Sequence, residues 1–375
     1  MLSPTVLPYS TTPRLQNYTT TDFWFTDGNI ILFVGNVAFK VHRGQLVRHS
    51  DVFHDMFSLP QPASEEGQGL VDGCAWVTLH DDPSDMLHLL RALYDGLYFT
   101  KVSSGDFCAI SAVLRMSTKY LIEHLRKRCM ERLEADWPTT LAGWDKREQQ
   151  ATADGRYNPR EYYAHPIMVI KLAQELGGLE HILPAAFYDL SRYGPRKIAH
   201  GASLMPGLLP ATIAQLAARA KAKGQAEDAL RLTRGDLRAT FLGREASQRA
   251  LAAFIDAELA GRGVSANCAN RHHVNGHHCR ESFYFIMLNL LRSVSGIASG
   301  RDADPLFSML QAVEMLSRTD FSDGTKQCGL RICASCKEDF ALSAAAARKA
   351  AWDQIPVWFG LKPGCPVKES AKMEA

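Results

Sequence analysis

The chain has 375 residues, a formal net charge of +2 and 46% hydrophobic residues, so it is long enough for two or three domains with buried cores. Lysine and arginine are spread along the chain, which predicts no nucleic-acid partner. No apolar run is long enough to span a membrane, and residues 1–21 lack the pattern of a signal peptide. Nine cysteines without regular spacing argue against a disulfide framework. We therefore expect a cytoplasmic or nuclear protein with reduced thiols and no membrane partner.

A β-hairpin followed by a helix is predicted early in the chain. Two β-branched and aromatic runs, Ile30–Val34 and Val37–Val41, are separated by Gly35-Asn36, a pair that tolerates the positive φ of a tight turn. Apolar residues then fall at helical spacing, and Ser50 is placed to cap a helix over residues 51–57. Two antiparallel strands that lead into helices are the expected result.

A third strand and three further helices are predicted next. Residues 75–80 alternate apolar and polar side chains, which is typical of a strand with one buried face. Residues 81–84 start a helix, for which Ser84 is the expected cap. Two amphipathic segments, residues 107–114 and 119–133, follow at helical spacing.

This order of elements resembles the BTB/POZ domain, an α+β module in which a short sheet is wrapped by helices. The resemblance covers residues 22–135 and implies a protein-interaction module that self-associates, recruits a partner or serves as a substrate adaptor of a cullin-type ubiquitin ligase. Such adaptors usually carry a hydrophobic-x-acid motif just beyond Phe57, where this chain has Ser-Leu-Pro-Gln-Pro. The residues that carry the resemblance are Asp27, Phe39, Val41, His42, Arg43, Leu46, Ser50, Phe53, Met56 and Phe57.

The rest of the chain is expected to be mostly helical. One helix should end at Gly177-Gly178, and Asp304-Pro305 should begin another as cap and first-turn proline. Further helical segments are predicted at residues 183–190, 209–222, 236–259 and 283–294. Phrases at residues 138–145, 183–192 and 352–361 resemble a BTB-domain family abundant in mushroom-forming fungi.

These patterns predict five successive parts. They are a mobile tail at 1–21, the BTB/POZ domain at 22–135, a linker at 136–160, a helical region at 161–262 and a helical Cys/His-containing region at 263–375. Pro4, Pro8 and Pro13 prevent the tail from supplying a regular helix to a second subunit. Any homodimer is therefore expected to be weak and to use the helical surface of the domain itself.

One cluster carries metal-ligand chemistry. Cys268 and Cys279 bracket a histidine-rich loop, and Cys333 and Cys336 form a CxxC motif just before a predicted helix. Zinc takes four soft or borderline ligands in a tetrahedron, so these four cysteines predict a structural zinc site. The residues that could replace one of these ligands are His273, His277, His278 and Cys328. The alternative interpretation is four reduced thiols beside a solvated histidine loop.

Catalysis has no support in the sequence. No P-loop, G-x-G-x-x-G, G-x-S-x-G or H-E-x-x-H pattern occurs. His42 is interpreted as structural, and Cys74, Cys108 and Cys129 as small core residues. We expect a non-enzymatic interaction protein with protein partners, a cullin among the candidates, and a metalloenzyme at the Cys/His cluster is the remaining alternative.

Overall fold

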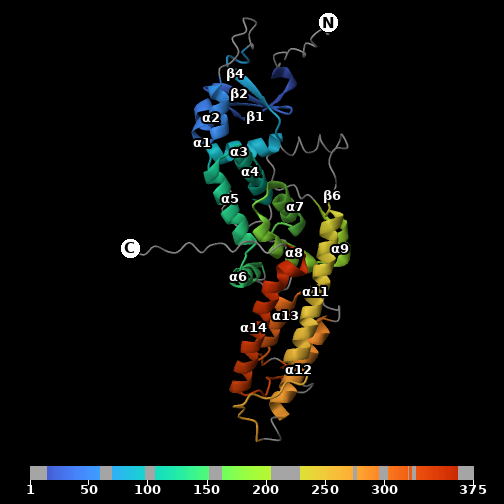
Figure 1. Cartoon of the computed structure of the whole chain (residues 1–375). Coiled ribbons are helices and arrows are strands. Elements are labelled where there is room, and N and C mark those ends of the chain that lie inside the picture. Colours follow the sequence, from blue (N-terminus) through green and yellow to red (C-terminus); the bar gives the residue numbers. More distant parts are fainter. Residues whose placement is uncertain are drawn as a thin grey trace, which may run out of the picture. The chain divides into compact units, whose positions relative to one another are not determined.

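The computed structural model describes residues 15–59, 70–97, 106–151, 163–203, 229–272, 277–294, 303–319, 321–322 and 327–361 (Figure 1). They form two compact units. Unit 1 comprises the described residues up to 136 together with 163–164, and unit 2 comprises the others. Within the described ranges, no helix combines the length and the apolar character needed to cross a membrane.

Unit 1 contains a four-stranded sheet in the order β1-β3-β2-β4. Its strands are β1 (Thr19–Trp24), β2 (Ile30–Val34), β3 (Val37–Val41) and β4 (Ala75–Leu79). The central strands β2 and β3 are antiparallel and fully buried, whereas β1 and β4 run parallel to the central strand that each one pairs with.

The predicted hairpin is confirmed. Val34 pairs with Val37, and Gly35 between the strands has a φ of 57°, a conformation that glycine adopts without steric cost. β1 begins at Thr19, inside the range predicted as a tail. It forms there because Thr19 and Thr20 pair with β3 and because the Tyr18 ring lies 4.4 Å from the Phe33 ring.

Five longer helices complete unit 1. The Ser50 hydroxyl accepts a hydrogen bond from the Phe53 N–H, which confirms the predicted cap of the second helix. The cap of the third helix is Asp82 rather than Ser84, because Pro83 occupies the first helical position and the Asp82 carboxylate accepts from the next two N–H groups. The helices are α1 (Arg43–His49), α2 (Asp51–Ser58), α3 (Pro83–Tyr94), α4 (Phe107–Lys119) and α5 (Glu123–Asp136).

Unit 2 is almost entirely helical. In Figure 1, α11, α13 and α14 lie side by side as a bundle, in agreement with their packing. Two short hairpins, β5–β6 (Ala202–Ser203 with Ala229–Leu230) and β7–β8 (Phe321–Ser322 with Gln327–Cys328), complete it. The helices are α6 (Leu141–Ala151), α7 (Pro166–Leu176), α8 (Leu183–Ser191), α9 (Pro195–His200), α11 (Arg234–Glu258), α12 (His277–Val294), α13 (Pro305–Glu314) and α14 (Ala334–Trp358).

Most of the predicted helical segments of unit 2 are present. α7 ends where Gly177 has a φ of 65°, and Asp304 caps α13 by accepting from the Phe307 N–H. The predicted linker contains α6, whose Trp144 is 1% exposed. The predicted helix at 209–222 lies outside the described residues.

A buried network of charged side chains links α6, α8 and the start of α13. The Asp189 carboxylate accepts from both Arg147 (2.9 Å) and Arg192 (2.6 Å). Arg192 also donates to Glu148 (2.7 Å) and to Asp304 (2.8 Å). The two arginines, Asp189 and Asp304 are at most 2% exposed, so each buried charge has an opposite charge in contact with it.

Candidate metal centre

Four cysteine thiols meet at one end of unit 2. Cys268 lies in the turn region that follows α11, and Cys279 lies in the first turn of α12. Cys333 is the N-cap residue of α14, and Cys336 follows in its first turn. All four sulfur atoms lie within 4.8 Å of one another. The structure thus brings together two cysteine pairs that are more than fifty residues apart in sequence.

The spacing of the sulfur atoms fits a tetrahedral metal site. The Cys268 sulfur lies 3.7 Å from the Cys279 sulfur and 3.8 Å from the Cys333 sulfur. A disulfide would need about 2 Å, and all four thiols are free. Four thiolates at the usual zinc–sulfur distance of about 2.3 Å would have their sulfur atoms about 3.8 Å apart.

Nitrogen donors surround the sulfur atoms. The Ser265 N–H donates to the Cys336 sulfur (3.3 Å), and the Cys333 N–H donates to the Cys279 sulfur (3.4 Å). The Asn270 side-chain amide donates to the Cys279 sulfur at 3.2 Å. Such donors favour the thiolate, which is the form that binds a metal. The starts of α12 and α14 add the partial positive charge of a helix N-terminus.

Burial and hydrogen bonding act in opposite directions on these thiols. Burial raises the pKa of Cys268 and of Cys336. It also raises the pKa of Cys333, but hydrogen bonds from the backbone N–H groups of Cys336 and Ala269, together with its sulfur neighbours, outweigh burial and lower that pKa to about 6. A bound cation would compensate for the burial of the negative charges, because metal binding displaces the thiol protons.

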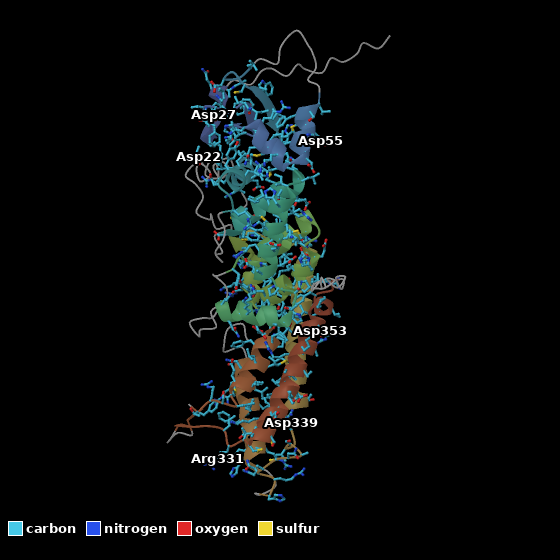
Figure 2. All side chains as sticks on the ribbon, turned by 90° about the vertical axis from the view of Figure 1, so that its left-hand side faces the viewer. Asp22, Asp27, Asp55, Arg331, Asp339 and Asp353 are labelled. Carbon is cyan, nitrogen blue, oxygen red and sulfur yellow. The ribbon has the colours of Figure 1, made fainter. Side chains whose placement is uncertain are left out.

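Packing next to the cluster holds the helices that carry it. The Arg262 guanidinium lies over the rings of Phe283 on α12 (5.4 Å) and Phe340 on α14 (5.2 Å), and it pairs with Asp339 at 3.1 Å. Figure 2 shows Asp339 near the cysteine end of α14 and Asp353 toward its other end. Side-chain contacts therefore also hold together the helices that carry the thiols.

The alternative ligands lie apart from the four cysteines or are not described. His277 and His278 form a second group with Glu281, in which His277 and Glu281 are exposed. Residue His273 lies outside the described residues, and the side chain of Cys328 on β8 is not described. Among the described side chains, no histidine or carboxylate belongs to the group formed by the four cysteines.

His42 has two polar neighbours in unit 1. Its Nδ1 lies 3.0 Å from the Tyr94 hydroxyl, and its Nε2 lies 3.2 Å from the Asp27 carboxylate. Burial raises the pKa of Tyr94, which keeps the phenol protonated. The Tyr94 hydroxyl also accepts the backbone N–H of His42, so these bonds tie the end of β3 to α3. This arrangement supports a structural role for His42.

The three remaining cysteines with described side chains lie in or beside the core of unit 1. Cys74 and Cys129 are buried, and Cys108 is half-buried. Burial raises the pKa of the Cys129 thiol to about 12, so this thiol stays protonated and poorly nucleophilic.

Comparison with known protein families identifies part of the chain. A family model described as the BTB/POZ domain matches residues 25–136, which include the β2–β3 hairpin and helices α1 to α5. The chain contains a BTB/POZ domain. This match confirms the resemblance and the α+β fold class, and a mostly helical region follows the BTB/POZ domain. A search of curated proteins found no match.

BTB/POZ domains are protein-interaction modules and are generally not enzymes, so the family supports a protein-interaction role for this chain. The finer resemblance to a family of mushroom-forming fungi stays a prediction, as does the division of the chain into five parts.

Proposed function

We propose that this protein is a non-enzymatic interaction protein whose BTB/POZ domain recruits a protein partner or a second copy of itself. The observation that carries the proposal is the BTB/POZ match over residues 25–136.

Crosslinking and mass spectrometry of the native complex tests this proposal. Phe39 on β3 is fully buried, so Phe39→Asp places a charge in the core and disrupts the domain. Partners that need the BTB/POZ domain should be crosslinked to the parent chain and lost from the variant. If the same proteins are crosslinked to both chains, the BTB/POZ domain does not recruit them.

Self-association is one form of this function. We expect a concentration-dependent equilibrium between monomer and dimer, measured by analytical ultracentrifugation of the full chain. If the chain sediments as a monomer at every concentration, self-association is excluded and the recruitment of other proteins is the remaining form of the proposed function.

A substrate adaptor of a cullin-type ubiquitin ligase is a second candidate. BTB/POZ domains include cullin binders, which supports the role in general. The residues after Phe57 depart from the adaptor motif, as noted above, which favours the first candidate. A pull-down of the purified full chain with a cullin separates the two. Saturable binding would establish the adaptor role.

We further propose that the four cysteines hold a structural zinc ion. Four thiolates fill the zinc tetrahedron, whereas a catalytic zinc needs an open position, so this ligand set favours a structural role over a metalloenzyme. Protein purified without chelator should contain close to one zinc per chain. Cys336→Ser should release the metal and destabilise the ends of α12 and α14 that carry the cysteines.

The matched control is Cys129→Ser, which removes a buried thiol from unit 1 and should leave the zinc content unchanged. Less than about a tenth of an equivalent of zinc in the parent chain would contradict the proposal, since structural sites bind zinc too tightly to lose it during purification.

A further inference from the structure

Helix α12 carries an exposed apolar stripe. Tyr284 is 57% exposed, Leu288 is 40% exposed and Leu291 is 44% exposed. Their spacing of four and three residues places them along one face of the helix. The opposite face packs into unit 2 through Phe283, Ile286 and Leu290, which are at most 2% exposed. The stripe is therefore a second apolar face on a helix whose first face is already buried.

Opposite charges flank this stripe at its two ends. Glu281 and Arg292 are both exposed and are eleven residues apart, which is about three helical turns or about 16 Å. After three turns the two side chains lie on the same flank of the stripe, one before Tyr284 and one after Leu291. Both side chains already have a contact within the chain: Glu281 lies 3.7 Å from His277 in an exposed pair, and Arg292 also has an interaction partner, so the ion pairs between copies would replace or add to these contacts.

We propose that the exposed stripe of α12 binds the same stripe of a second copy of this chain, with the two helices antiparallel. A two-fold axis near the middle of the stripe brings Glu281 of each copy beside Arg292 of the other. It also places Tyr284 of one copy against Leu288 of the other. In a parallel pair the flank that carries Glu281 and Arg292 would face the opposite flank of the other copy, so neither side chain would meet its opposite charge, and the charges favour the antiparallel pair.

The expected contact is small. Three apolar side chains from each copy and two ion pairs per dimer correspond to the low end of specific interfaces, so association through α12 should be weak and concentration-dependent. It is separate from any association of the BTB/POZ domain. A chain that used both surfaces would form assemblies larger than a dimer.

A charge-swap experiment tests the proposal on the full chain. We would compare the parent with Glu281→Arg, with Arg292→Glu and with the double variant, by sedimentation velocity over a range of concentrations. Each single variant creates two like-charge pairs per dimer and should weaken this association step about tenfold. The double variant restores both ion pairs with the charges exchanged. Its dissociation constant should return to within about threefold of that of the parent.

Two further variants separate the stripe from general effects of charge. Leu288→Glu should abolish the same association step. Leu342→Glu changes a leucine of α14 that is 67% exposed and lies outside the stripe, and it should have no effect. Both positions are exposed, so circular dichroism should show a folded protein in each case.

The proposal is overturned if the single variants and Leu288→Glu associate like the parent, or if the double variant stays as weak as the single ones. The first result would assign any remaining association to another surface, such as that of the BTB/POZ domain. If the variants lose the association through α12 but still associate through the BTB/POZ domain, the proposal is supported. The experiment therefore tests the α12 interface separately from the function proposed for the BTB/POZ domain.

Discussion

His88 is a buried histidine on α3, and its environment should make unit 1 sensitive to acid. Burial, together with the nearby charge of Arg91, lowers its pKa from 6.5 to about 4, and Asp82 opposes this change only in part. The unfolded chain therefore binds a proton below pH 6.5 that the folded chain resists until about pH 4. The contribution of neutral His88 to the free energy of unfolding is fully present well above pH 6.5. It is lost as the pH falls from 6.5 toward 4, and the loss is about 2.5 kcal/mol at pH 4.5.

His88→Leu should remove this contribution. The free energy of unfolding of the parent should fall between pH 7 and pH 4.5 by about 2.5 kcal/mol more than that of the variant, measured by hydrogen exchange of α3 amides. His54→Leu changes an exposed histidine of α2 and is the control. Equal pH dependence in the parent and in His88→Leu would show that His88 is not the group responsible.

Gly243 on α11 allows a close approach of the Phe359 ring. A Cβ atom added at residue 243 would overlap with Cε1 of Phe359, and this ring is 2% exposed and cannot move aside easily. Gly243→Ala should therefore destabilise unit 2 by about 1–3 kcal/mol in thermal or urea unfolding. In Gly44→Ala the added Cβ meets no atom within 4 Å, so this helical position should gain about 0.5–1 kcal/mol. A stabilising effect at Gly243 would contradict the packing described here.

At the scale of the elements, Ser50 joins two parts of unit 1. Its hydroxyl caps α2 and donates to the Tyr120 carbonyl at 2.6 Å, just after α4. Ser50→Ala should cost about 2 kcal/mol, because it removes the cap and leaves a buried carbonyl without its donor. Thr233→Ala removes an exposed cap of α11 and should cost about 1 kcal/mol. Similar losses in urea unfolding would indicate that the Tyr120 contact adds nothing.

The buried charges of unit 2 hold α6 to α8. Asp189→Asn replaces one carboxylate oxygen by an NH₂ group that would face Arg147 or Arg192, which are themselves donors. The variant should lose about 3 kcal/mol, because it removes the carboxylate that both buried arginines share and places a donor against them, although Arg147 keeps Glu148 and Arg192 keeps Glu148 and Asp304 as partners. Glu245→Gln, in an exposed pair with Arg249, should lose less than about 1 kcal/mol. Thermal unfolding that shows equal, small losses would contradict the role assigned to this network.

At the scale of the whole molecule, the division into two units predicts that the BTB/POZ domain folds alone. A fragment of residues 15–136 contains the complete sheet and helices α1 to α5, although it lacks residues 163–164 of unit 1. A fragment that begins at residue 22 lacks Leu15 and Tyr18, which pack against the core cluster that contains Phe33. The longer fragment should show a cooperative unfolding transition, and the shorter one should melt at a lower temperature. Equal melting temperatures would indicate that residues 15–21 contribute no stability.

The sequence by itself determined the elements whose signals are local. The β2–β3 hairpin, the Ser50 cap and the end of α7 at Gly177 each depend on residues within a few positions of one another, so propensity and spacing were sufficient. The Ser84 cap was wrong even at this range, because Pro83 favours the first helical position and shifts the cap to Asp82.

Only the tertiary structure decided which distant residues meet. α6 was predicted as a linker because its sequence is polar, yet Arg147 is buried there by Asp189, which lies on α8. β1 needs the partner strand β3, and the parallel pairing leaves little local signal in a short polar strand. Burial of this kind depends on contacts between distant segments, and the pattern of apolar residues within one segment does not show which other segment covers it.

The four-cysteine cluster combines both situations. The residue types and the CxxC spacing predicted the chemistry, and the four predicted cysteines are those that meet. That the four sulfur atoms lie together, and that Ser265 and Asn270 donate to two of them, came only from the fold. The reason is physical: a tetrahedron about 4 Å wide is assembled from three separate segments, and their meeting is set by the packing of α11, α12 and α14.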